Sequence, residues 1–175
     1  MAKKITLEEM QARIASKIEN ATAAQQKELI FSNTEKGVYF SFDGITGYFL
    51  ENQQILTAVW DKLDDKRKEK SIRFRATAEK LFNANALLVK KIEKGKRKNY
   101  TGNFVKMYNP AIGNVYFFEK ELRQFPKNCC FYISGKYNPV LIGMMDQCGF
   151  LHIFALVMPV RMLDTEFIAA EEATA

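Results

Sequence analysis

The sequence predicts an α+β fold in which antiparallel strands outnumber helices. Three observations support this prediction. A capping box, Thr6-Leu7-Glu8-Glu9, precedes apolar residues at helical spacing. Two aromatic-rich runs flank the turn residues Asp43-Gly44, as in a β-hairpin. A second hairpin is expected near the end of the chain, with strands at 139–144 and 150–160.

The first half of the chain is expected to hold two helices and a hairpin. Residues 6–30 should be helical, with a narrow apolar stripe that must dock on another surface. Strands are predicted at 38–42 and 46–50. A second helix at 51–66 follows from one broad apolar face, formed by Ile55, Leu56, Val59, Trp60 and Leu63.

The second half is expected to be mostly strand. Residues 71–76 alternate between apolar and basic side chains, which indicates a strand with one basic face. Further strands are predicted at 81–84, 86–92, 103–108 and 129–134, and a basic loop is predicted at 95–99. A third helix at 114–125 should turn four large apolar side chains inward and end at Pro126.

Composition limits the class of protein. The 175 residues are 47% hydrophobic and 13% aromatic, which is enough for a packed core. Charges, Gly or Pro interrupt every apolar run, so no membrane span is expected. The N-terminus lacks the apolar stretch of a signal peptide. The three cysteines form no CxxC pair and suit buried thiols. We therefore expect a cytoplasmic protein.

The positive charge is concentrated in two clusters. The formal net charge is +6, and basic residues gather at 62–70 and at 90–98. Such clusters favour a polyanionic partner, most often nucleic acid. The alternative is that both are ordinary solvated surfaces.

The segment from about residue 48 to 162 resembles the C-terminal domain of the bacterial sliding clamp, the β subunit of DNA polymerase III. The resemblance is carried by Val105-Lys106-Met107-Tyr108-Asn109-Pro110 before the run 116–125, by Asn138-Pro139-Val140-Leu141-Ile142, and by Leu156-Val157-Met158-Pro159-Val160-Arg161. It implies a DNA-clamp-like α+β domain at 37–162, with antiparallel sheets and two helices on one face. An extra N-terminal helix and linker would occupy 1–36, and an acidic tail would occupy 163–175.

The resemblance also implies sites and partners. A clamp slides on double-stranded DNA through cations on its helices, without reading bases. The candidate DNA-binding residues are Lys62, Lys66, Arg67, Lys70, Lys120, Arg123 and Lys127. The family also binds peptides of replication proteins, such as a polymerase, in an apolar groove near its C-terminus. The matching positions are Leu156, Val157, Met158, Pro159, Val160, Arg161 and Met162.

The chain also departs from the family. A clamp ring contains six such domains, whereas this chain has room for one, so encircling DNA would require a homo-oligomer. The residues after Met162 and the helix before Phe31 have no counterpart in a clamp domain. The sequence is therefore expected to be a non-catalytic processivity factor or replisome adaptor.

Two other functions stay open from sequence. No metal ligand set, cofactor loop or catalytic group is expected, because the only histidine, His152, lies in mid-strand. A small metal-independent ribonuclease would use His152, Arg161, Lys136 and Tyr132. An interaction or inhibitor protein would bind replication proteins without binding DNA.

Overall fold

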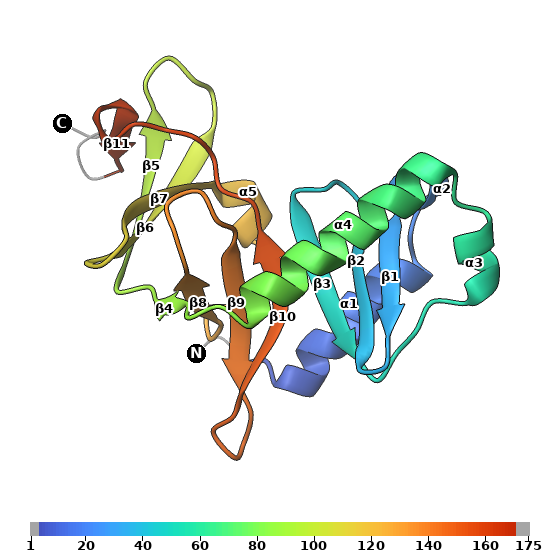
Figure 1. Ribbon diagram of the computed structural model, residues 1–175. Coiled ribbons are helices and arrows are strands. Elements are labelled where there is room, and N and C mark those ends of the chain that lie inside the picture. The colour runs from blue at the N-terminus through green and yellow to red at the C-terminus, as the bar shows by residue number, and fades with distance from the viewer. Residues whose placement is uncertain (1–3, 171–175) are drawn as a thin grey trace.

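The computed structural model describes residues 4–170, which form two antiparallel sheets and five α-helices (Figure 1). The helices are α1 (Leu7–Glu19), α2 (Ala23–Glu28), α3 (Thr57–Asp61), α4 (Asp65–Phe82) and α5 (Glu119–Leu122), with a 3-10 helix η1 (Asp164–Glu166). The strands are β1 (Ile30–Thr34), β2 (Gly37–Ser41), β3 (Thr46–Glu51), β4 (Leu87–Leu88), β5 (Lys91–Arg97), β6 (Asn103–Asn109), β7 (Gly113–Phe118), β8 (Cys130–Ile133), β9 (Val140–Met145), β10 (Leu151–Val157) and β11 (Phe167–Ala169).

Strand β10 holds the larger sheet together. The strand order is β1-β2-β3-β10-β9-β8-β4. Both predicted hairpins are present, β2–β3 and β9–β10, and β10 pairs with β3 on one side and β9 on the other. Its register with β9 shifts between Ile153 and Ala155, which is a β-bulge. The sheet thus joins early and late parts of the chain at one strand.

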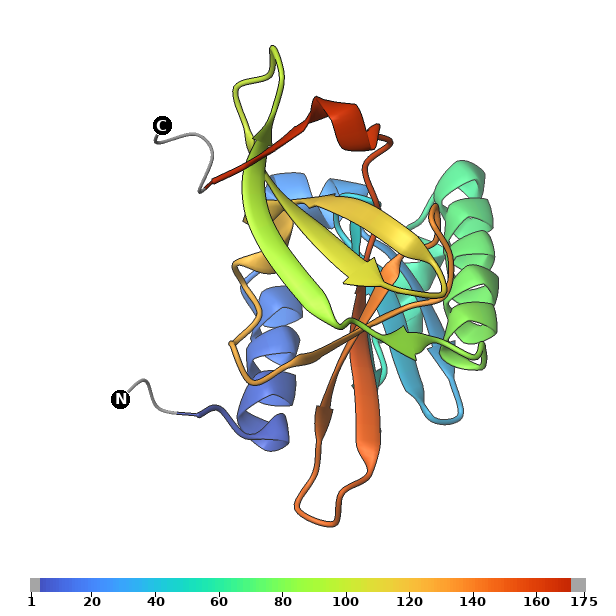
Figure 2. The same cartoon turned by 90° about the vertical axis from the view of Figure 1, so that its left-hand side faces the viewer.

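The smaller sheet packs against the β8–β9 side of the larger one. Its order is β11-β5-β6-β7, and Figure 2 shows it in front. Val105 and Phe117 of this sheet share one buried cluster with Val140 and Ile142 of the larger sheet. A single backbone bridge, Tyr116 to Val160, ties the two together after β10. The two sheets therefore enclose a common core.

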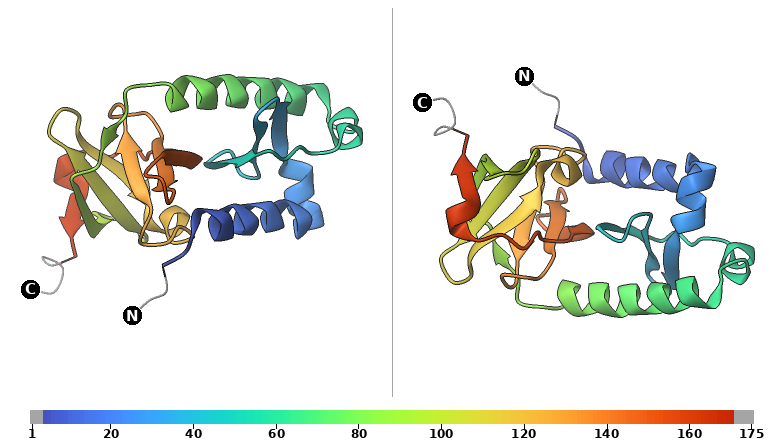
Figure 3. Two further views of the ribbon diagram at one scale, coloured as in Figure 1. Left: turned by 90° about the horizontal axis from the view of Figure 1, so that it is seen from below. Right: turned by 90° about the horizontal axis from the view of Figure 1, so that it is seen from above.

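Helices α1 and α4 cover opposite faces of the larger sheet (Figure 3). Alternate residues of β2 divide between them, since Phe40 joins the cluster of Met10 from α1 and Tyr39 joins the cluster of Ala78 from α4. Leu122, the last residue of α5, belongs to the cluster on the α1 side. The mixed α+β class is confirmed.

Residues 71–76 are helical, so the predicted strand there is wrong, as is the one at 81–84. Asp64 accepts a hydrogen bond from the Arg67 amide at 2.8 Å and begins α4, which continues to Phe82. The helix turns Ser71 and Ala78 toward the sheet, and these small residues hid its apolar stripe. Gly47 permits this close packing, since a Cβ there would lie 2.5 Å from Phe74 Cζ.

Two other predicted helices are shorter than expected. The predicted helix 114–125 is a strand up to Phe118, because Asn109 and Gly113 pair across a tight turn and start the β6–β7 hairpin. The predicted helix 6–30 is two helices, since Thr22 and Gln25 form a second capping box that starts α2.

Both terminal segments pack into the fold. Met10 and Ile14 of α1 are buried, and β1 pairs with β2 across the predicted boundary at residue 36. After residue 162 the chain forms η1 and β11, and β11 pairs with β5. The Asp164 carboxylate accepts a 2.6 Å bond from the Tyr116 hydroxyl, and Glu166 pairs with Arg97. Glu171 and Glu172 of the predicted acidic tail lie outside the described residues.

Ser71 links α4 to strand β1, and its removal is expected to destabilise the fold. Its buried hydroxyl accepts from the Phe31 amide at 3.0 Å and donates to the Arg67 carbonyl at 2.8 Å. Ser71→Ala leaves a buried amide unpaired and should lower the free energy of unfolding by about 1–3 kcal/mol in urea titration. Thr77→Ala is the matched control, because that exposed hydroxyl bonds only its own helix. Equal losses in both variants would contradict this role.

Candidate nucleic-acid interface

The upper edge of the molecule in Figure 1 gathers elements that carry basic residues. From right to left it presents the N-terminal end of α4, the β2–β3 turn, α5 and the tip of the β5–β6 hairpin. We call its cations the basic edge: Lys17, Lys27, Lys62, Lys66, Arg67, Lys70, Lys94, Lys96, Lys98, Lys120 and Arg123. Six of these eleven belong to the set predicted from sequence.

At the α4 end, Arg67 is fixed and its neighbours are exposed. The Arg67 guanidinium donates to the Lys27 carbonyl at 2.8 Å and pairs with Asp64 at 3.1 Å, which joins α4 to α2. The Arg67 amide bond to Asp64 lowers the pKa of that carboxyl. Lys62, Lys66 and Lys70 are exposed, and within residues 4–170 they form no ion pair.

At the α5 end, one buried carboxylate organises two cations. The Glu119 side chain is 8% exposed and accepts from Lys94 at 2.7 Å and from Arg123 at 2.8 Å. The hydrogen bond from Lys94, followed by that from Arg123, lowers the pKa of Glu119. Lys94 and Arg123 still expose 69% and 65% of their side chains. Glu119 thus aligns these cations and leaves most of their surface to solvent.

Helices α1 and α2 connect the two ends. A hollow of about 390 Å³ is lined by Lys17, Asn20 and Gln25 on one side and by Lys120 and Gln124 on the other. Its acidic groups are engaged internally, since Asp43 accepts the Ile45 and Thr46 amides and Glu121 accepts the Thr46 hydroxyl. The basic edge therefore continues from α4 to α5 across the end of α1.

Lys127 lies apart from this edge. Its neighbour Asn128 donates to the Ile5 carbonyl at 2.8 Å, which places Lys127 beside the beginning of α1. Lys17 and Lys120 lie at the other end of that helix, whose 13 residues span roughly 20 Å. Lys94, Lys96 and Lys98, on or beside β5, belong to the edge, although the predicted site omitted them.

The predicted partner groove is mostly filled by the protein itself. Leu156, Val157 and Met162 are buried, and Val160 forms the bridge to Tyr116. Pro159 is half-buried, which leaves Met158 and Arg161 as the exposed members. Leu156 and Val157 belong to a central strand with helices on both faces, so they cannot line a groove. Sequence alone did not reveal that helices cover both faces of this strand.

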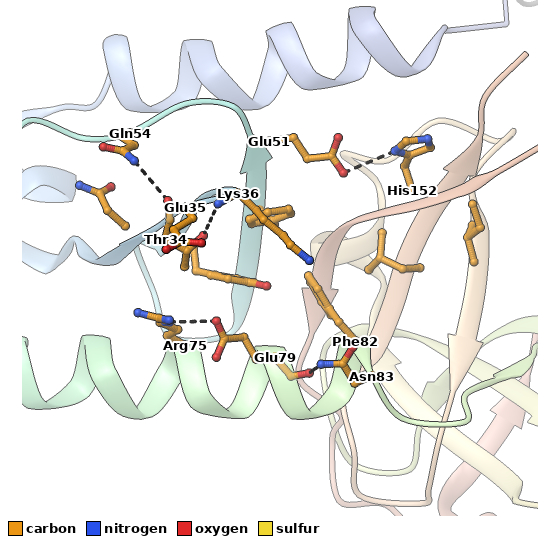
Figure 4. Close-up of a pocket in the computed structure, with 15 residues that line it drawn as sticks. Thr34, Glu35, Lys36, Glu51, Gln54, Arg75, Glu79, Phe82, Asn83 and His152 are labelled. Atoms are coloured by element: carbon orange, nitrogen blue, oxygen red, sulfur yellow. Dashed lines mark hydrogen bonds and ion pairs between the residues drawn. The ribbon is translucent and has the colours of Figure 1, made fainter.

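A large cleft lies between α4 and strands β2, β3 and β10 (Figure 4), and none of the cations of the basic edge lines it. It encloses about 960 Å³ over a floor of Tyr39, Phe49 and Phe82, with the first two rings stacked at 4.5 Å. On its rim, Arg75 pairs with Glu79 at 2.9 Å. Charges of both signs line this cleft, so it does not favour a polyanion.

His152 at the mouth of this cleft is held between two carboxylates. Its Nδ1 lies 3.4 Å from Glu51 and its Nε2 lies 3.0 Å from Asp146. The hydrogen bond to Asp146 raises the pKa of His152, and burial opposes it. Because both ring nitrogens are engaged, the imidazole connects β3 to the β9–β10 turn and presents no free nitrogen to a substrate.

The four residues of the ribonuclease hypothesis are not brought together. Tyr132 pairs with Leu141, which pairs with Leu156, so it lies four strand positions, roughly 13 Å, along the sheet from His152. Arg161 follows the far end of β10, where its guanidinium lies 6.0 Å from the Tyr137 ring next to Lys136. These residues do not form one catalytic site.

Comparison with known proteins places the chain in no family. No protein-family model, curated protein or solved structure matches the chain. Within residues 4–170, no group of three or more His, Cys, Asp or Glu side chains could hold a metal ion. No helix in the same range is both long and apolar enough to cross a membrane.

The contacts of His152 with Glu51 and Asp146, here called the His152 link, should be detectable in the titration of its imidazole. Because His152 is the only histidine, its ring proton gives one NMR signal whose midpoint should lie above 6.5. The link should stabilise the fold below pH 6.5, and this stability should be lost as pH rises through the raised pKa.

Asp146→Asn should lower that midpoint, and Asp164→Asn, which alters a carboxylate bonded to Tyr116, should not. A wild-type midpoint at or below 6.5 would refute the link.

Proposed function

We propose that this chain is a non-catalytic, DNA-associated protein that binds the phosphate backbone of double-stranded DNA through the basic edge. The observation that supports this most directly is the buried Glu119, which holds Lys94 and Arg123 side by side while both stay largely exposed. Lysine and arginine on such a surface bind phosphates and release counterions, which gives affinity without sequence preference.

The acidic residues along the edge support the same proposal. Asp64, Glu119 and Glu121 each accept hydrogen bonds from the fold, and the Glu121 side chain is only 13% exposed. Their charges are thus offset at short range, whereas Lys62, Lys66, Lys70, Lys96 and Lys98 form no ion pair within residues 4–170. A phosphate backbone that approaches this edge meets these five ammonium groups, with the exposed carboxylates of Asp61 and Asp65 among those at the α4 end.

Neutralising two cations at the α5 end should weaken DNA binding in a salt-dependent way. In fluorescence anisotropy with a duplex, Lys120→Gln with Arg123→Gln should reduce affinity and lower the slope of log K against log salt by about 2. The matched control is Lys127→Gln, an exposed lysine away from the edge, which should leave both quantities unchanged. Equal effects of both changes would refute the basic edge as the binding surface.

The clamp-like form of this proposal adds self-assembly and contact with replication proteins, and it rests on the sequence resemblance above. A strand at the end of the larger sheet could form the contact between two copies of the chain. Strand β4 ends the larger sheet with Leu87 and Leu88 38% and 43% exposed. At the other end, the Phe31 amide of β1 donates to the Ser71 hydroxyl of α4, and the Asn33 side chain donates to the Ile55 carbonyl. Because the Leu88 carbonyl already accepts from the Asn109 side chain, a homo-oligomer would join through the exposed leucine side chains of β4 rather than through its backbone.

Light scattering tests this form. An oligomer would give a multiple of the 20.1 kDa chain mass, and Leu87→Lys with Leu88→Lys should return it to a monomer. Leu56→Lys with Ile72→Lys is the control, because both are exposed away from β4. A monomer at every concentration, with and without circular DNA, would rule out the ring. Binding of the DNA phosphate backbone would still be decided by the anisotropy experiment.

A further inference from the structure

We propose that the basic edge carries, at its β5–β6 end, a pocket that takes one unpaired base of single-stranded DNA. This inference rests on the proposed DNA binding and adds a contact that the basic edge makes with unpaired bases. The pocket encloses about 350 Å³ between the β5–β6 tip and α5, and Tyr100, Phe118, Lys120 and Arg123 are among its lining residues. Its size lies near the lower end of the roughly 300–1,000 Å³ of small-molecule sites.

Tyr100 provides an aromatic surface for stacking. It is 49% exposed, and its ring meets Phe104 at 5.4 Å and Phe118 at 6.2 Å. These contacts support part of the ring and leave about half of the residue to solvent. Base stacking on such a ring is tolerant of sequence, because every base has an aromatic face.

The backbone fixes the position of this ring. Asn99 adopts a φ of 58°, a conformation that asparagine tolerates, and the Tyr100 amide donates to the Arg97 carbonyl at 3.2 Å. Gly102 leaves room for the ring, since a Cβ there would lie 2.7 Å from Tyr100 Cε1. The stacking surface is therefore preorganised, which reduces the entropy lost on binding.

Cations flank the ring where the phosphates of a stacked nucleotide would lie. Lys120 Nζ lies 5.7 Å from the Phe118 ring, and a second hollow of about 360 Å³ is lined by Lys94, Lys96 and Arg123. Glu119, at the base of both hollows, is occupied by Lys94 and Arg123 and so repels phosphate weakly. Bases paired inside a duplex cannot reach Tyr100, whereas an unpaired base can.

The test compares Tyr100→Ala with wild type on three ligands of equal length: a thymine single strand, the same backbone with abasic sites, and a blunt duplex. Tyr100→Ala should weaken binding of the thymine strand by about tenfold, as expected for the loss of one stacked base. It should change binding of the abasic strand and the duplex less than twofold. Tyr100→Phe should bind the thymine strand like wild type.

Tyr108→Ala is the matched control, because Tyr108 is 36% exposed at the far end of β6 and should not affect any ligand. If Tyr100→Ala lowered the affinity for the thymine and abasic strands equally, or lowered neither, the base pocket would be overturned. Binding of the duplex by the wild type would still support the proposed function. Failure of the wild type to bind any of the three ligands would overturn both. Tighter binding of a uracil RNA strand than of the thymine strand would overturn the DNA assignment.

Discussion

The burial of strands β2 and β3 on both faces is the constraint on which the rest of the structure depends. Every residue of β2 is buried, as is every residue of β3 before Glu51. A sheet region covered on both sides requires two separate layers, and α1 and α4 provide them. The polar groups within it are bonded internally, since the Ser41 hydroxyl donates to the Thr46 carbonyl at 2.7 Å. Around β2 and β3, charged side chains are consequently confined to the ends of the strands and to the surrounding helices.

This confinement separates two chemical environments. At one end of the strands, carboxylates such as Asp64 and Glu119 bond to the fold and hold cations outward, so the surface is basic. At the other end, Glu51 and Asp146 each bond to the His152 ring, and the cleft beside them carries both signs of charge. The two surfaces differ because their carboxylates have different bonding partners, and this favours the basic edge over the larger cleft as the proposed DNA-binding site.

Local sequence signals predicted the parts of the fold that depend on neighbouring residues. The Asp43-Gly44 hairpin and the Thr6 cap are present because turn and capping bonds lie within a few residues. The alternation of apolar and basic residues at 71–76 wrongly predicted a strand. Ile72 is 59% exposed and does not face the core, whereas Ser71 does. Lys66, Arg67, Lys120 and Arg123 were predicted as DNA-binding residues from the resemblance to a clamp, and that role stays a prediction. Their connection through α1 and α2, and the covering of Leu156 and Val157, depend on tertiary packing that no local pattern encodes.

The position of β10 also has a consequence for how the chain folds during synthesis. Hairpins β1–β3 and β8–β9 can pair locally, but only β10 joins them, and it pairs with Tyr48 more than a hundred residues earlier. Long-range pairing of this kind is slow, because closing a large loop costs entropy before any contact compensates for it. A nascent chain would therefore carry two unjoined strand edges until residue 157 had left the ribosome. During that interval α1 and α4 can cover the two faces of β1–β3, whereas the edge of β3 stays open until β10 pairs with it.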